Sequence, residues 1–210
     1  MNIFREGEPA PAWCALREFQ TIELAAGQSV KLQRKHPSEL FFVIYGAGRV
    51  TVPQFSLVLK EQQFAVIPEG VTEIGLSAAA RPAEFVRFSG NWGSDVFGSS
   101  LFRVAHDVRS SFVGDTVSYP KNTSFDRHYH DYDEYWLILE GSGTVVIGDE
   151  TFGVRRGDCV ATGAGYHHDF PLIDRPVRAL ALEVSIAGQG RLGHLWSHTH
   201  GPAVPCPGRH

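Results

Sequence analysis

Residues 39–50 read ELFFVIYGAGRV, and residues 134–145 read EYWLILEGSGTV. The two stretches lie 95 positions apart, and at this offset a glutamate, an apolar run and two turn glycines coincide. The same offset aligns Thr21 with Thr116 and Gly70 with Gly165, and it holds from residue 21 to residue 73 without an insertion. A match of turn and strand signals at one fixed spacing indicates an internal duplication. The chain therefore contains two copies of one structural unit.

Both copies have the composition of β-structure. Runs rich in β-branched and aromatic residues are broken by Gly or Asn, and no long amphipathic helix is evident. The sequence predicts an all-β protein built from two small barrels or sandwiches, each closing its own sheet edges. The expected boundaries are residues 1–90 for the first unit, a Gly/Ser-rich linker over 91–109, residues 110–187 for the second unit, and a Gly/Pro/His-rich tail over 188–210.

The overall composition excludes several classes of protein. Hydrophobic residues make up 43% and charged residues 20% of the 210, a balance typical of a globular chain rather than a disordered one. The net charge of −4 gives no reason to expect binding to nucleic acid or to an anionic membrane. The longest apolar run, Leu40 to Tyr45, is too short to span a bilayer, and no secretory signal precedes it. Three cysteines without close spacing favour free thiols, so we expect a cytoplasmic protein.

The second copy carries four side chains with metal-ligand chemistry. His128 and His130 are two positions apart, so on a strand both imidazoles leave the same face. Glu134 begins the next strand pattern, and the turn Gly163-Ala-Gly165 leads to His168. Three imidazoles and one carboxylate that converge from neighbouring strands form a site for a divalent transition metal such as Fe, Mn, Ni, Co or Zn.

The spacing of these residues resembles the two-part motif of the cupins, G(x)5HxH(x)3E(x)6G followed by G(x)5PxG(x)2H(x)3N. The chain is similar to a bicupin over about 170 of its 210 residues. The resemblance implies two tandem cupin barrels (a double-stranded β-helix or jelly roll), a metal held by His128, His130, Glu134 and His168, and a homodimer. Three positions depart from the motif: Asn122 for the first Gly, Gly163 for Pro, and Leu172 for the final Asn. Because Asn tolerates a left-handed backbone, Asn122 is expected to be a mild change.

The first copy keeps the frame of the motif without its ligand set. At the offset of 95, Gln33, Lys35, Glu39 and Glu73 stand where the second copy has its four ligands. An ammonium group offers a cation no lone pair. We therefore expect a metal-free, structural N-terminal barrel whose centre is filled by a salt bridge from Lys35 to Glu39 or Glu73, and binding of a small ligand through Lys35 is the alternative.

The residues around the predicted metal suggest a reaction without fixing it. Alternation from Glu134 and His168 turns Trp136, Ile138 and Phe170 inward, either as an apolar substrate wall or as ordinary barrel core. Asp126 is either an outer partner of a ligand imidazole or a surface residue.

Tetrahedral zinc would leave the site closed, whereas six-coordination would leave two positions for a chelating substrate. The expected function is a dioxygenase- or isomerase-like enzyme acting on a small oxygenated metabolite, aromatic or sugar-like. The alternative is a non-catalytic cupin that binds or senses a small molecule.

Overall fold

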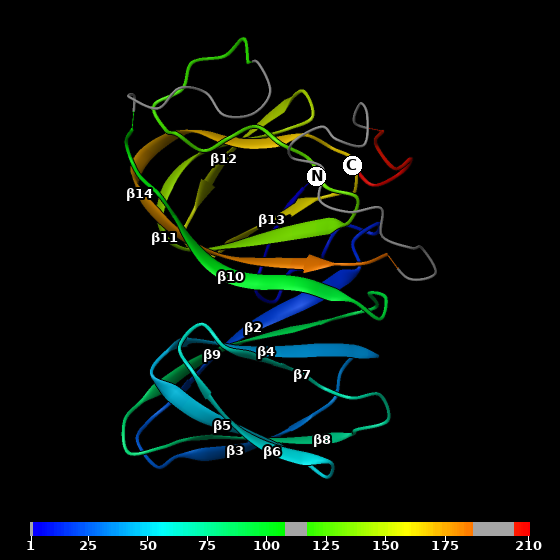
Figure 1. Ribbon diagram of the computed structural model, residues 1–210, viewed down its shortest axis with the longest axis vertical. Coiled ribbons are helices and arrows are strands. Elements are labelled where there is room, and N and C mark those ends of the chain that lie inside the picture. Colours follow the sequence, from blue (N-terminus) through cyan, green and yellow to red (C-terminus); the bar gives the residue numbers. More distant parts are fainter. Residues whose placement is uncertain (1, 108–116, 187–203) are drawn as a thin grey trace. The chain divides into compact units, whose positions relative to one another are not determined.

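The computed structural model describes residues 2–107, 117–186 and 204–210. The chain forms two compact units (Figure 1). The N-terminal unit comprises Glu6–Ala10 and Ala15–Trp92, and the C-terminal unit comprises Met1–Arg5, Pro11–Cys14 and the chain from Gly93 onward. All regular structure among the described residues is β-strand, which confirms the predicted all-β fold.

The N-terminal unit consists of two four-stranded antiparallel sheets. One has the order β2-β9-β4-β7 and the other the order β3-β8-β5-β6. The strands are β2 (Leu16–Leu24), β3 (Ser29–Gln33), β4 (Ser38–Tyr45), β5 (Ala47–Val52), β6 (Phe55–Lys60), β7 (Phe64–Val66), β8 (Glu73–Ala78) and β9 (Ala83–Gly90). The core draws Phe41, Val43 and Phe85 from the first sheet and Val50 and Ile74 from the second. Alternate residues of each strand therefore fill the space between the sheets.

The described residues of the C-terminal unit form one six-stranded sheet of order β1-β13-β11-β14-β10, with β12 paired to β11. The strands are β1 (Ile3–Arg5), β10 (Val96–Val104), β11 (Asp133–Ile147), β12 (Glu150–Arg155), β13 (Asp158–Thr162) and β14 (His168–Val184). The long strands β11 and β14 pair from Asp133↔Val184 to Ile147↔His168 with four register shifts, which bend the pair around the core. This core includes the inward side chains of Trp136, Ile138 and Phe170.

The glycines that revealed the repeat have the same role in both units. Gly46 and Gly141 have positive φ angles of 76° and 85°. A Cβ on Gly46 would overlap the carbonyl oxygen of Pro82, and a Cβ on Gly141 would overlap that of Pro176. Each turn therefore requires glycine both for its backbone conformation and for the close approach of the neighbouring chain.

Two segments differ from the boundaries expected from the sequence. Residues 1–90 were assigned to the first barrel, but β1 pairs antiparallel with β13 of the C-terminal unit. Its Arg5 Nε also donates a hydrogen bond of 2.7 Å to Asp158. Residues 91–109 were expected to be a linker, but β10 pairs with β14 from Val96↔Val184 to Val104↔Val177. Small and polar residues made this stretch look irregular, whereas backbone hydrogen bonds to a long neighbouring strand make it part of the sheet.

Candidate metal centre

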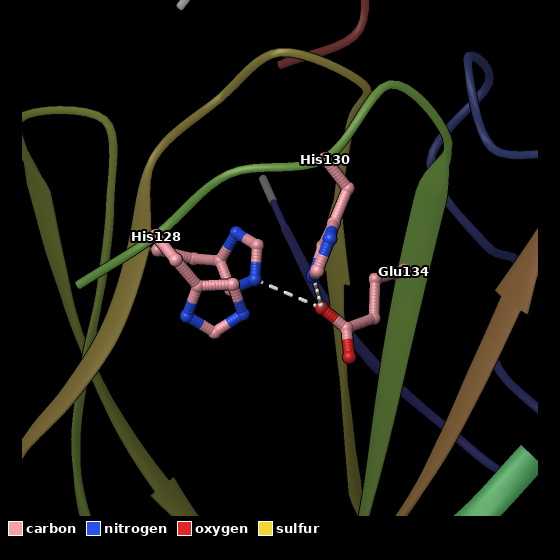
Figure 2. Close-up of side chains that lie close together, drawn as sticks. His128, His130 and Glu134 are labelled. Atoms are coloured by element: carbon pink, nitrogen blue, oxygen red, sulfur yellow. Dashed lines mark ion pairs between the residues drawn. The ribbon is translucent and has the colours of Figure 1, made fainter. Parts of the chain in front are cut away.

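Four predicted ligands meet in the C-terminal unit. One potential ligand atom from each of His128, His130, Glu134 and His168 lies within 4.8 Å of the others. The His168 Nε2 atom lies 2.8 Å and the His130 Nε2 atom 3.2 Å from Glu134 Oε2. Figure 2 shows the labelled side chains of His128, His130 and Glu134 turned toward one another. All four residues are buried, with between 1% and 6% of their surface exposed.

Different elements supply these ligands. Glu134 is the second residue of β11, and His168 is the first residue of β14. His128 forms an isolated bridge with His168, in which the His168 N–H donates to His128 O at 2.8 Å. The segment from His128 to His130 is therefore not part of a β-strand, but the bridge to His168 holds it alongside the start of β14.

Backbone carbonyls orient two of the imidazoles. The Nδ1 atom of His128 lies 3.1 Å from the carbonyl oxygen of Asp126, and that of His168 lies 3.1 Å from the carbonyl oxygen of Tyr166. A hydrogen bond at Nδ1 fixes the tautomer whose Nε2 lone pair is available to a metal. The Asp126 carboxylate lies 3.7 Å from the same His128 nitrogen, so the main chain is the nearer outer partner.

The electrostatics of the centre favour a neutral His128 imidazole beside an ionised Glu134 carboxylate. Burial, with a further contribution from His168, lowers the pKa of His128 to about 2. Burial acts to raise the pKa of Glu134, but the charges and hydrogen bonds of His130 and His168 outweigh it and hold this pKa well below its ordinary value. These are the protonation states in which imidazole and carboxylate bind metals.

The donor set fits a transition-metal ion. Two imidazole nitrogens, His168 Nε2 and His130 Nε2, converge on the buried Glu134 Oε2 atom at 2.8 and 3.2 Å. Imidazole nitrogens and carboxylate oxygens both offer lone pairs to a cation, so atoms of these kinds that converge in the interior can share one metal ion. Three imidazoles and one carboxylate suit Fe, Mn, Ni, Co or Zn.

Aromatic side chains line one side of the four ligands. The Trp136 ring lies 5.3 Å from the His168 ring and is stacked 6.2 Å from the Phe170 ring. Phe102 and Phe125 extend this group, with ring centroids 5.5 and 5.3 Å from Trp136. Sequence alternation identified Trp136 and Phe170 but not Phe102 or Phe125. Phe102 lies in the stretch expected to be a linker, and Phe125 lies outside any strand.

A buried ion pair anchors the segment that carries His128 and His130. Lys121 Nζ donates hydrogen bonds of 2.7 Å to both carboxylate oxygens of Asp169, the neighbour of His168. The Tyr119 hydroxyl donates to the same carboxylate at 2.8 Å, and Lys121 also donates to Phe125 O. The side chains of Lys121 and Asp169 are 4% and 0% exposed. This pair ties the His-x-His segment to the start of β14, a role that the sequence reasoning missed.

Asn122 does not have the role expected from the motif. Among the described residues, Gln62 is the one non-glycine residue with positive φ, so Asn122 does not adopt the left-handed backbone that a turn glycine could supply. Instead its amide oxygen accepts from Ile173 N at 2.9 Å, and its amide nitrogen donates to Ile173 O at 3.1 Å. The side chain thus pairs with the backbone of β14 as a neighbouring strand would.

The corresponding centre of the N-terminal unit holds an ion pair. Arg87 Nη2 lies 2.5 Å from Glu39 Oε1, and the two side chains are 3% and 0% exposed. The expectation that Lys35 fills this centre is wrong, because Lys35 pairs with Glu18 at 2.8 Å on a partly exposed face. Glu73 likewise pairs outside, with Lys31 at 2.9 Å. In the pairing of β4 with β9, Arg87 lies opposite Phe41, two residues from Glu39. Arg87 therefore lies on the same inward face as the core residue Phe41, and its guanidinium lies inside the unit.

A cysteine and several further histidines are not among the four residues that meet at this centre. Cys159 is fully buried, and burial raises the pKa of its thiol, which fits a core residue rather than a nucleophile. The His167 ring packs 4.7 Å from that of Tyr129, outside the ligand group. The tail histidines His194, His198 and His200 lie outside the described residues. Within the described part of the chain, no helix is long and apolar enough to cross a membrane.

Comparison with known proteins places this centre in a family. A sequence model of the cupin domain matches residues 115–183, which include all four ligands. The uncharacterized protein y4oW of Sinorhizobium fredii is 39% identical over 209 residues, covering 100% of this chain and 96% of that protein.

Solved structures share the fold at low sequence identity. Oxalate decarboxylase from Bacillus subtilis superposes with a TM-score of 0.61 and 12% identity, covering 91% of this chain and 78% of the other. AerE from Microcystis aeruginosa gives a TM-score of 0.54 and 13% identity, covering 80% and 90%. The Bacillus enzyme holds Mn(II) centres. The all-β architecture of the present chain fits two tandem cupin barrels. The chain therefore belongs to one family with y4oW, and it contains a cupin domain that spans residues 115–183.

Proposed function

We propose that the chain is a mononuclear metal-dependent enzyme of the dioxygenase or isomerase type, acting on a small oxygenated molecule in its C-terminal barrel. The observation that carries this proposal is the buried group of three imidazoles and one carboxylate, in which two imidazoles are oriented through Nδ1. Four protein ligands leave two positions open on a six-coordinate ion. A bound ion would polarise a substrate oxygen and stabilise negative charge that develops there.

The aromatic group beside the ligands supports a substrate with a flat apolar face. Trp136 and Phe170 are buried; the Trp136 ring lies beside the His168 ring, and Phe170 stacks on Trp136. Phe102 and Phe125 are partly exposed, so substrate would approach along their edge of the group. These rings would orient the carbon skeleton and exclude water from the reacting oxygens. We therefore propose aromatic molecules with two adjacent oxygen donors as the substrate class.

The first test of this proposal is the metal content of the untagged protein. Wild type should contain about one equivalent of Fe, Mn, Ni or Co per chain, and His128→Ala and His168→Ala should each lose it, because each variant removes one of four ligands. His36→Ala is the matched control, since this histidine also lies beside a carboxylate, 3.6 Å from Glu18, in the other unit. Full metal content in both ligand variants, or none in reconstituted wild type, would overturn the proposal.

The second test separates the reaction types. The metal-loaded protein should convert aromatic substrates that carry catechol-like or hydroxy-carbonyl groups, and the His168→Ala variant should not. Turnover that consumes oxygen identifies a dioxygenase, whereas turnover without oxygen identifies an isomerase or lyase. Tight binding of such molecules to loaded protein without turnover under either atmosphere would overturn the enzyme proposal and favour a binding or sensing cupin.

A further inference from the structure

The segment Val204–His210, here called the strap, lies against the turn that delivers His168. The N–H of Cys206 donates to the carbonyl oxygen of Ala164 at 2.9 Å. The His210 ring stacks on the Tyr166 ring with centroids 4.9 Å apart and planes 24° apart. Figure 1 shows this segment in red at the end of the chain. The strap therefore contacts the same turn whose Tyr166 carbonyl orients His168.

The turn is shaped to receive the strap. A Cβ on Gly163 would overlap the backbone of Arg209, and a Cβ on Gly165 would overlap the backbone of Val204. Gly163 is also the position at which the cupin motif has proline. The proline ring of the motif would occupy the space that the strap fills, whereas glycine has no side chain and leaves this space open. The departure from the motif and the presence of the strap thus have one steric explanation.

Arg209 connects the strap to the strand that carries Glu134. Its Nε donates a hydrogen bond of 2.8 Å to Asp133 Oδ1, and its Nη2 forms an ion pair with Asp133 Oδ2. The Asp133 side chain is completely buried, and that of Arg209 is 15% exposed. The guanidinium carbon also lies 5.5 Å from the centroid of the Trp13 ring. A guanidinium that contacts both oxygens of a buried carboxylate fixes the position and the orientation of the two groups relative to one another.

Asp133 in turn joins the elements around the ligands. Its Oδ1 accepts from Ala164 N at 3.2 Å, which ties the turn to the start of β11. Gly165 N in the same turn donates to the carbonyl oxygen of His130 at 2.6 Å. Segments carrying His130, Glu134 and His168 therefore meet at the surface that the strap covers.

We infer that the strap positions the metal ligands, and that Arg209 is its positioning residue, acting through Asp133 on Glu134 and through the turn on His130 and His168. This inference rests on the proposed metal centre. Outer partners of metal ligands typically change metal affinity by roughly 10–100-fold when removed. Loss of Arg209 should therefore weaken metal binding by at least about tenfold.

The test is a chelator competition that measures metal affinity in Arg209→Gln. Arg5→Gln is the matched control, because Arg5 also pairs with a buried aspartate of this unit, Asp158 at 2.7 Å, away from the ligands. The absorption spectrum of the Co(II)-loaded protein, a readout of ligand geometry, should change in Arg209→Gln and not in Arg5→Gln. If Arg209→Gln does not fold, the double variant Asp133→Asn/Arg209→Gln leaves no unpaired charge at this contact. It should show the same loss of metal affinity.

A purely steric pair of variants gives an independent measurement. Gly163→Ala should displace the strap and weaken metal binding like Arg209→Gln, since the atoms nearest to its Cβ all belong to Arg209. Gly153→Ala is its control, because a Cβ at Gly153 meets nothing within 4 Å. Metal affinities of Arg209→Gln and Gly163→Ala equal to those of their controls would overturn the inference while the proposed function stands. Wild type that takes up no metal would overturn both.

Discussion

Replacing Arg87 with methionine removes the guanidinium from Glu39 and leaves an unbranched side chain in the core of the N-terminal unit. The Glu39 carboxylate then keeps three donors, Lys35 N at 2.6 Å, Ser89 Oγ at 3.0 Å and His36 N at 3.5 Å, and all three act on Oε1. The other oxygen, Oε2, loses the Arg87 Nε donor at 3.1 Å. The variant therefore contains a buried carboxylate without a counter-charge.

The expected loss of stability follows from this geometry. Removing one member of a buried ion pair costs about 3–5 kcal/mol, because the remaining charge has lost its solvation and gained nothing in return. The double variant Glu39→Gln/Arg87→Met removes both charges and should recover most of this loss.

Urea unfolding measures these differences. For a slope of about 2 kcal/mol/M, a loss of about 4 kcal/mol lowers the midpoint by about 2 M. Hydrogen exchange of peptides within residues 16–90 assigns the transition to the N-terminal unit. Lys31→Met is the control, because its pair with Glu73 is largely exposed, and it should change stability by only about 0.2–1 kcal/mol. A loss below about 1 kcal/mol in Arg87→Met, equal to that of the control, would refute the reasoning.

Three further changes test other parts of the molecule. Lys121→Met should destabilise the C-terminal unit by about 3–5 kcal/mol in urea unfolding, because it leaves the buried Asp169 carboxylate without its cation, and a change within experimental error would contradict this role. Asn122→Gly restores the motif residue yet should lower stability by about 1–3 kcal/mol, because Ile173 N loses its acceptor, and a more stable variant would show that backbone conformation matters more. Glu39→Gln should leave metal content unchanged by elemental analysis, since its carboxylate is engaged by Arg87, and a parallel loss of metal would place a ligand in the N-terminal unit.

Local sequence patterns were sufficient to predict most of the fold and the four candidate metal ligands. Turn glycines such as Gly46 and Gly141 are fixed by the backbone conformation of their own turns, so they recur at a constant spacing. Alternation along a strand likewise fixed the inward direction of Trp136 and Phe170. The short spacing from His128 to Glu134 is local too, and His168 follows a recognisable turn. For these features the neighbouring residues contain the necessary information.

Partners that lie far apart in the chain were decided by the tertiary structure. Arg87 rather than Lys35 pairs with Glu39 because the β4–β9 register, set by the whole sheet, turns its side chain inward. Arg209 reaches Asp133 across 76 positions, and no sequence period relates the two. A buried charge must be neutralised by whichever opposite charge the fold brings within contact distance. The sequence by itself therefore determined the all-β repeat and the four candidate metal ligands, and only the packing of distant strands decided which buried charges pair with one another.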